Sequence, residues 1–132
     1  MNFELGCRVH CTRYIRKSGN RYEVIPAEKT QDGIELALFI ERGAKEPVEI
    51  YGSHVCDSIR FVDKQFDGVF VGTTTIPSKL GCEYVEPVYG FAGWCFEKYN
   101  PIKVAIVYFA QGRKHLVPLD SIFPMEVKKT NE

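Results

Sequence analysis

Two segments in the second half of the chain constrain its fold most: residues 66–77, FDGVFVGTTTIP, and residues 103–118, KVAIVYFAQGRKHLVP. Both are dense in β-branched and aromatic residues and are interrupted by glycine, the pattern of strands in a small, strongly bent antiparallel sheet. Residues 66–72 place apolar side chains on both faces, which predicts a central strand. Gly68 and Gly72 would let that strand bend.

The first half of the chain contains further candidate strands. Residues 5–14 alternate between apolar and polar side chains, and Lys17-Ser18-Gly19-Asn20 has the composition of a hairpin turn, so we expect residues 21–27 to return as the partner strand. Residues 34–40 (IELALFI) fit either a buried strand or a short helix, and their length and β-branched ends favour a strand. Residues 48–51 and 54–62 are strand candidates, with a turn expected at 63–65.

The last third of the chain predicts a long connection followed by a hairpin. Residues 78–101 are expected to form an aromatic connection, and residues 103–110 and 113–119 a hairpin around Gln111-Gly112. One helical turn is predicted at 120–123 and a frayed tail at about 126–132. Short strands with turn signals every 8 to 12 residues predict one domain, 1–132, that is all-β or β-rich α+β and is built as a small bent antiparallel barrel.

Charge and cysteine content exclude several classes of protein. The chain has 17 Lys and Arg and 17 Asp and Glu, so we expect no whole-molecule attraction to nucleic acid or to an anionic membrane. Residues 1–30 are mainly basic and residues 31–70 mainly acidic. No apolar run approaches the ~20 residues of a membrane span, and no signal peptide is evident. An odd count of five cysteines without regular spacing favours reduced thiols, which predicts a cytoplasmic protein.

The final hairpin and the turn after it, VPLDSIFP, resemble the closing part of SH3-like barrels, and FDGVFVG is similar to one of their central bent strands. This resemblance covers about the last half of the chain. The chain also resembles, more loosely, small proteins carried by bacteriophages and other mobile elements. That resemblance implies an inhibitor of host defence, of the anti-CRISPR type, whose partner is a bacterial protein such as a CRISPR-Cas effector nuclease.

The most unusual segment is residues 82–100, in which aromatic residues alternate with glycine and glutamate. Such rings concentrate binding energy when a partner desolvates them. The alternatives are that they cap one end of the barrel as core residues, or that they form an aromatic cage for a cation such as a modified lysine. The predicted partner-binding residues are Tyr84, Tyr89, Phe91, Trp94 and Tyr99.

Histidine and cysteine residues raise the question of structural zinc. His54 and Cys56 lie on the same face of a predicted strand, about 7 Å apart at their Cα atoms. Cys7 and Cys11 would be roughly 13 Å apart on a strand, too far to share one ion. The alternative is that the cysteines are ordinary core residues, since free cysteines are commonly buried. We therefore predict no cofactor, with zinc at His54 and Cys56 as the alternative.

A second candidate function rests on the basic hairpin predicted at residues 13–21. Arg13, Arg16, Lys17 and Arg21, with tyrosines nearby, could contact a phosphate backbone and stack on exposed bases. Hairpin tips are also commonly charged simply because they are exposed. Nucleic-acid binding by an SH3-like barrel is therefore the alternative to inhibition through protein binding.

No motif indicates catalysis. His54 and Cys56 are the only neighbouring pair that resembles a base and a nucleophile, and no carboxylate or carboxamide is identified to orient them. The glycines are isolated at turns, so no phosphate-binding loop is expected. We predict a protein that is not an enzyme.

Overall fold

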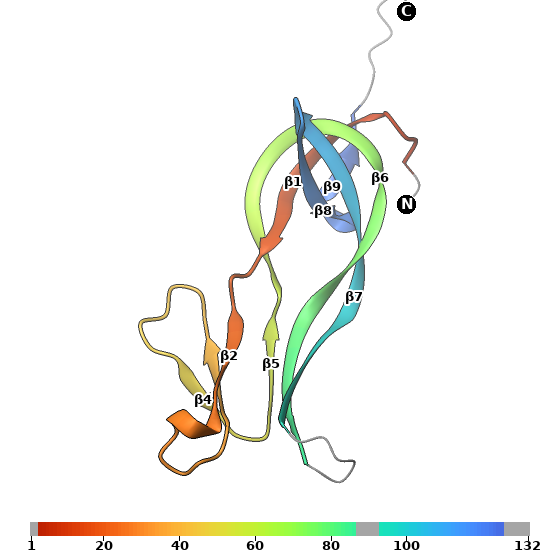
Figure 1. The fold of residues 1–132 in the computed structure, drawn as a ribbon. Coiled ribbons are helices and arrows are strands. Elements are labelled where there is room, and N and C mark those ends of the chain that lie inside the picture. Colours follow the sequence, from red (N-terminus) through yellow and green to blue (C-terminus); the bar gives the residue numbers. More distant parts are fainter. Residues whose placement is uncertain (1–2, 87–92, 126–132) are drawn as a thin grey trace, which may run out of the picture. The chain divides into compact units, whose positions relative to one another are not determined.

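The computed structural model describes residues 3–86 and 93–125, and this part of the chain is all-β. No α-helix occurs among these residues, and the only helical segments are two 3-10 turns, Ala27–Lys29 (η1) and Leu119–Ser121 (η3). The strands, shown in Figure 1, are β1 (Arg8–Lys17), β2 (Arg21–Ile25), β3 (Leu36–Ile40), β4 (Val48–Ile50), β5 (Ser53–Asp57), β6 (Ile59–Val85), β7 (Gly93–Ala110), β8 (Arg113–Pro118) and β9 (Ile122–Pro124).

The strands form two sheets. The larger has six strands in the order β5-β6-β7-β8-β1-β9, with an additional pairing of β6 with β1. The smaller contains β2, β3 and β4 in that order, paired antiparallel with Tyr22 opposite Phe39 and Ala37 opposite Ile50. The predicted ambiguity at 34–40 is thereby resolved, because Leu36–Ile40 is a strand.

β6 and β7 are the two longest strands, with 27 and 18 residues. Two predictions are wrong here: residues 63–65 continue β6 without a turn, and most of 78–101 belongs to these strands rather than to a long connection. Breaks in the strands were expected at both places. The strands continue through them because β6 and β7 pair with each other.

The basic hairpin predicted at residues 13–21 is also wrong. β1 pairs with β8 and β9, whereas β2 pairs with β3 in the other sheet. Residues 18–20 therefore connect two sheets and do not turn one strand back on its neighbour. The final hairpin is confirmed: β7 ends at Ala110 and β8 begins at Arg113, with Val104 opposite Pro118. The helical turn that follows is shorter than predicted, since Ile122 and Phe123 already belong to β9.

Contacts within the chain divide it into two compact units. The first unit consists of Met1–Arg16, Arg60–Ile76 and Ile102–Glu132, and the second of Lys17–Ile59 and Pro77–Pro101. The prediction of a single domain stays a prediction, because a unit is defined by its contacts and a domain by independent folding.

The first unit has a mainly aliphatic core that also contains two buried rings. Its buried residues are Val9, Cys11, Tyr14, Phe70, Ala105, Val107, Val117 and Ile122. The predicted central strand 66–72 lies in β6, where Phe70 is buried but Val71 is 39% exposed, so only one of its faces is covered. Gly68 lies against β7: a Cβ there would be 2.5 Å from the carbonyl oxygen of Tyr108 and from Cγ1 of Val107.

The second unit has a smaller and more aromatic core. Ala37, Ile50 and Cys82 are buried, and the rings of Tyr22, Phe39 and Trp94 pack against them. Tyr22 anchors this core, because its hydroxyl donates to the carbonyl oxygen of Leu80 (3.1 Å) and contacts Nδ1 of His54 at 2.9 Å. This bonding joins β2 of the small sheet to β5 and β6.

Candidate functional site

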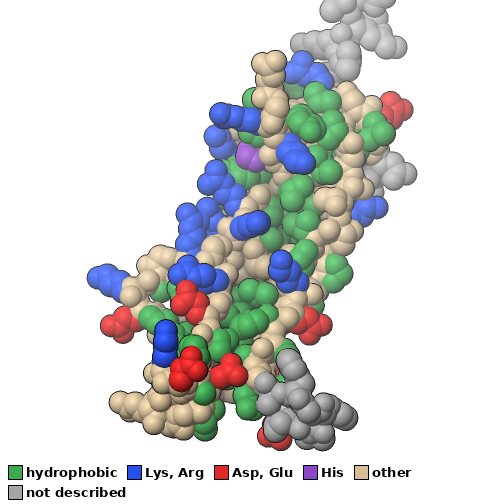
Figure 2. Space-filling view, viewed as in Figure 1, with side chains coloured by type: hydrophobic (Ala, Val, Ile, Leu, Met, Phe, Trp, Pro, Cys, Tyr) green, Lys and Arg blue, Asp and Glu red, His purple; other side chains and the backbone are tan. Residues whose placement is uncertain are grey.

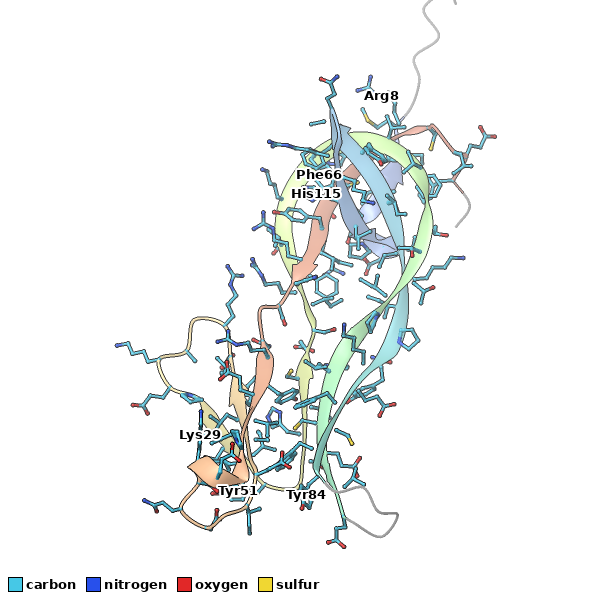
Figure 3. The ribbon with its side chains drawn as sticks, viewed as in Figure 1. Arg8, Lys29, Tyr51, Phe66, Tyr84 and His115 are labelled. Carbon is cyan, nitrogen blue, oxygen red and sulfur yellow. The ribbon has the colours of Figure 1, made fainter. Side chains whose placement is uncertain are left out.

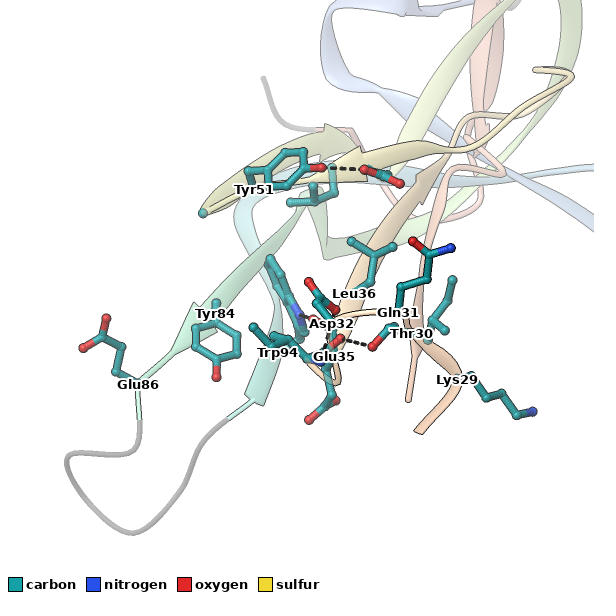
Figure 4. Close-up of a pocket in the computed structure, with 15 residues that line it drawn as sticks. Lys29, Thr30, Gln31, Asp32, Glu35, Leu36, Tyr51, Tyr84, Glu86 and Trp94 are labelled. Atoms are coloured by element: carbon teal, nitrogen blue, oxygen red, sulfur yellow. Dashed lines mark hydrogen bonds between the residues drawn. The ribbon is translucent and has the colours of Figure 1, made fainter. Parts of the chain in front are cut away.

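A cleft of about 760 Å³ opens at one end of the second unit (Figure 4). Its walls come from the segment that follows β2, the start of β3, the end of β4, the end of β6 and the start of β7. The lining is Ile25, Lys29, Thr30, Gln31, Asp32, Ile34, Glu35, Leu36, Glu49, Ile50, Tyr51, Gly52, Tyr84, Glu86 and Trp94. Aromatic, aliphatic and acidic side chains therefore meet in one place.

Two of the predicted partner-binding residues form a wall of this cleft. The rings of Tyr84 and Trp94 lie 5.5 Å apart between centroids, at an interplanar angle of 67°. This edge-to-face geometry is favourable for aromatic pairs. Trp94 is fixed further because its Nε1–H donates to the carbonyl oxygen of Glu35 at 3.2 Å. Tyr84 remains 37% exposed, so the wall is both oriented and accessible.

Tyr51 contributes a third ring that the sequence analysis missed. Its side chain is 79% exposed, and its hydroxyl donates to Oε2 of Glu49. This hydrogen bond raises the pKa of the Tyr51 phenol, because the carboxylate favours the protonated hydroxyl. A strand was expected at 48–51, but the meeting of Tyr51 with Tyr84 and Trp94 in one cleft could not be inferred from its local sequence.

The segment between η1 and β3 is shaped by local hydrogen bonds. The Thr30 hydroxyl lies within hydrogen-bond distance of the carbonyl oxygens of Ala27 (2.9 Å) and Ile34 (2.8 Å), and Oδ1 of Asp32 accepts from the backbone N–H of Ile34. Gly33 has φ 71°, a left-handed conformation that glycine adopts at little cost. These bonds hold Asp32 and Ile34 at the rim of the cleft.

The cleft is acidic. Among the described residues, its lining has four carboxylates, on Asp32, Glu35, Glu49 and Glu86, and a single cation on Lys29. The second unit as a whole has seven Lys and Arg against eleven Asp and Glu, a net charge of −4. Figure 2 shows several of these carboxylates gathered over this unit. The site should therefore favour cationic ligands.

The remaining predicted partner-binding residues lie elsewhere or cannot be placed. Tyr99 lines a separate cavity of about 200 Å³, with His54, Cys82 and Cys95, and its ring covers Gly81. Tyr89 and Phe91 lie outside the described residues. Of the three that the structure describes, Tyr84 and Trp94 are brought together in the cleft and Tyr99 is not.

The predicted zinc ligands lie on β5, as expected, but their surroundings differ from a metal site. His54 faces Tyr22 through Nδ1, and its register partner on β6 is Cys82, whose burial raises the pKa of its thiol to about 11. Among residues 3–86 and 93–125, no group of three or more His, Cys, Asp or Glu side chains is arranged to hold a metal ion. Zinc at His54 and Cys56 stays a prediction.

The four residues predicted to bind nucleic acid do not form one hairpin surface. Arg13 and Arg16 lie in the first unit, whereas Lys17 and Arg21 lie in the second. Nη2 of Arg13 lies 3.1 Å from each carboxylate oxygen of Asp120, and the guanidinium sits over the ring of Phe61 at 4.5 Å. Arg21 instead pairs with Glu23 at 3.2 Å.

Arg16 belongs to a basic and aromatic cluster in the first unit, part of which is labelled in Figure 3. His115 is stacked between Tyr14, at 3.9 Å between centroids, and Phe109, at 4.2 Å, while Phe66 meets it edge to face. Arg16 lies over Tyr14 at 5.6 Å. Burial, together with Arg16 and Lys64, lowers the pKa of His115. The cluster therefore favours a neutral imidazole beneath exposed cations.

The first unit has its own cleft, of about 660 Å³, and it differs in charge from that of the second unit. Phe3, Leu5, Phe70, Gly72, Thr73 and Leu119 line it, with Lys103 as its one charged residue. Among the described residues its lining has no carboxylate, although it contains a ring pair of its own, Phe3 and Phe70, with centroids 5.4 Å apart. We therefore take the acidic aromatic cleft as the candidate functional site.

Comparison with models of protein families, with curated proteins and with solved structures finds no match to this chain. Among the described residues, no helix is long and apolar enough to cross a membrane.

Proposed function

We propose that this protein acts by binding rather than by catalysis, and that the acidic aromatic cleft of the second unit holds a segment of a partner protein. One observation carries the proposal: Tyr84 and Trp94 form an oriented and accessible wall beside four carboxylates. Fixed aromatic side chains at the centre of an interface are the residues that most often dominate its binding energy. Because Trp94 is held by Glu35, little side-chain entropy would be lost on binding.

The partner that we propose is a bacterial defence protein, and a CRISPR-Cas effector nuclease is the first candidate. The resemblance to small phage proteins supports this class. Charge supports it as well, because such effectors hold nucleic acid in a positively charged channel, to which an acidic cleft is complementary. The protein would then act as an inhibitor in the bacterial cytoplasm, a compartment that suits five cysteines without a disulfide.

An SH3-like barrel is our proposal for the first unit. β6 pairs with β7, β7 with β8, β8 with β1, and β1 again with β6, so these pairings return to the strand from which they started. The 3-10 turn Leu119–Ser121 between β8 and β9 supports the same class, since a hairpin followed by a short helical turn is the part of the sequence that resembles these barrels.

The experiment measures binding to a panel of purified CRISPR effector–guide complexes by surface plasmon resonance. We expect Trp94→Ala and Tyr84→Ala each to weaken binding by about 2 kcal/mol, or roughly 30-fold. Tyr108→Ala is the matched control, because this tyrosine is 41% exposed in the first unit and lies outside the cleft. Circular dichroism checks that each variant is folded.

Two results would contradict the proposal. If no effector in the panel binds, the partner class is wrong. If an effector binds and neither aromatic truncation weakens the complex, the cleft is not the binding surface.

Nucleic-acid binding is the second candidate, and it would use the first unit. This unit has ten Lys and Arg against six Asp and Glu, a net charge of +4, and the Arg13 and Arg16 guanidinium groups lie over aromatic rings. Phosphate contacts would make binding weaken steeply with salt, whereas aromatic contacts with a protein would not. Fluorescence anisotropy with single-stranded DNA at two salt concentrations, on the wild type and on Arg16→Glu, separates the two functions.

A further inference from the structure

We propose that the acidic aromatic cleft binds the guanidinium group of an arginine side chain. This inference rests on the proposed function, since the arginine would belong to the partner protein. It is carried by the rings of Tyr84 and Trp94 together with the carboxylate of Glu35 beside them.

The two rings offer a planar surface for a planar cation. Trp94 is fixed by its hydrogen bond to Glu35, and Tyr84 meets it edge to face at 67°, so the two ring planes form a corner. Guanidinium groups stack on aromatic faces, and they are less strongly hydrated than ammonium groups. The first unit already shows this contact twice, at Arg13 over Phe61 and at Arg16 over Tyr14.

Glu35 adds negative charge to the same cleft, next to the residue that precedes Trp94. Its carbonyl oxygen accepts the indole N–H of Trp94, and its Oε1 lies 3.5 Å from the position that a Cβ on Gly93 would occupy. Among the described residues, no Lys or Arg forms an ion pair with any of the four cleft carboxylates. The carboxylate of Glu49 accepts a hydrogen bond from the Tyr51 hydroxyl, and Oδ1 of Asp32 accepts one from a backbone N–H. Both donors are neutral, so both carboxylates keep their negative charge.

Charge and shape together select arginine from the other possible occupants. A phosphate or a nucleic acid would be repelled by four carboxylates with one lysine among them. A neutral apolar peptide would leave those carboxylates desolvated without a partner. A carboxylate can accept two parallel N–H bonds from the guanidinium fork, a geometry that the lysine ammonium does not offer.

Trp94 reports on this cleft directly, because it is the only tryptophan of the chain. The probe is the tripeptide acetyl-Gly-Arg-Gly-amide, added to the full-length protein while Trp94 fluorescence is recorded. The matched probe replaces arginine with citrulline, which has nearly the same shape and no charge. We expect a saturable change with the arginine peptide and at least about tenfold weaker binding of the citrulline peptide, because a hydrogen bond to a charged group is stronger than a neutral one.

Variants locate the effect. Glu35→Gln keeps the carbonyl oxygen that holds Trp94 and removes the charge, so it should weaken the arginine peptide severalfold and leave the citrulline peptide unchanged. Glu46→Gln is the control, because Glu46 is exposed in the same unit and does not line the cleft. Equal binding of the two peptides would overturn the inference. So would tighter binding of tetramethylammonium chloride than of the arginine peptide, which would assign the cleft to a quaternary ammonium.

The failure of this inference and that of the proposed function are distinguishable. If Trp94→Ala abolishes binding of the effector while the arginine peptide does not bind, the proposed function stands and the guanidinium assignment falls. If the arginine peptide binds and Trp94→Ala leaves the effector complex intact, the cleft is a cation site and the proposed partner surface is wrong.

Discussion

Both units are built from antiparallel strands, but they differ in how their side chains are packed. In the first unit, aliphatic side chains such as Val9, Val107 and Val117 make up most of the core, which also buries Tyr14 and Phe70. In the second, rings outnumber aliphatic residues around a few buried positions, and Tyr84 and Trp94 remain partly open at a cleft. Core packing is thus concentrated in the first unit, whereas the second presents features that suit recognition.

Charge separates the units as clearly as packing does. The first has a net charge of +4 and the second of −4, so the zero net charge of the chain hides two opposite halves. A basic start and an acidic middle were visible in the sequence. The sequence does not show which distant segments make up each unit. That depends on the pairing of β6 with β7, because each of these strands contributes residues to both units.

Gly68→Val tests the packing of the first unit and should have the largest effect on stability. A Cβ at this position would lie 2.5 Å from a backbone oxygen of Tyr108 and from a methyl group of Val107, both in a well-packed strand. Overpacking of this kind typically costs 1–3 kcal/mol and here should reach about 3 kcal/mol or more, because backbone must move. Urea denaturation followed by circular dichroism measures the loss.

Gly33→Ala in the second unit is the control for this prediction. A Cβ there meets open space, so only the left-handed conformation, φ 71°, is penalised, at about 1 kcal/mol. If the two substitutions cost the same, the first unit is not closely packed around Gly68.

Local signals predicted part of this fold. The final hairpin was found because its turn, Gln111-Gly112, separates two segments that pair with each other. The turn at residues 17–20 looked the same in sequence, yet its flanking strands pair elsewhere. Only the positions of distant strands distinguish these two cases. The length of β6 was missed for the same reason, because its pairing overrides the turn expected at 63–65 and the strand end expected at residue 72.

The candidate site was predicted only in its aromatic component. Tyr84 and Trp94 belong to a segment whose density of rings is visible in the sequence. Tyr51, Asp32 and Glu35 are far from that segment along the chain and reach the cleft through the pairing of β2, β3 and β4. The excess of acidic residues in 31–70 was visible, but no local pattern indicates that Asp32 and Glu35 meet Tyr84 and Trp94 in one cleft.

Tyr22→Phe tests the aromatic core of the second unit, and its effect should be smaller than that of Gly68→Val. The substitution keeps the ring but removes the hydroxyl that bonds Leu80 and His54, leaving acceptors unsatisfied. We expect a loss of about 1–2 kcal/mol in the free energy of unfolding. Tyr108→Phe, on an exposed ring of the first unit, should change stability by less than about 0.5 kcal/mol.

A pH series adds a check that loss of packing alone would not mimic. Burial raises the pKa of the Tyr22 phenol above its ordinary value of 10.0. The unfolded chain therefore releases this proton first, and wild-type stability should fall as pH rises above about 10. Tyr22→Phe should show a shallower fall over the same range. Parallel pH profiles would mean that the hydroxyl is not buried as described.

The smallest expected effect concerns the pKa values of two histidines in the first unit, His10 and His115. It bears on the difference in net charge between the two units. Nδ1 of His10 lies 2.6 Å from Oδ1 of Asp67, and Nε2 lies 3.2 Å from Oε1 of Gln65. Acceptors at both ring nitrogens favour the doubly protonated ring, so the pKa of His10 is raised, mainly by the hydrogen bond to Asp67. The pKa of His115 is lowered by burial and by Arg16 and Lys64.

The two imidazoles should therefore titrate on opposite sides of 6.5, the ordinary value. The contribution of His10 to stability is fully present below pH 6.5 and is lost as pH rises through its raised pKa. The lowered pKa of His115 instead reduces stability at pH values below 6.5, and this cost disappears as pH rises above 6.5. NMR titration of the three imidazole signals measures both values. Asp67→Asn should return His10 toward 6.5 and leave His115 unchanged. If His10 instead titrated below His115, the pairing with Asp67 would be absent in solution, and the first unit would gain less positive charge as pH falls toward 6.5.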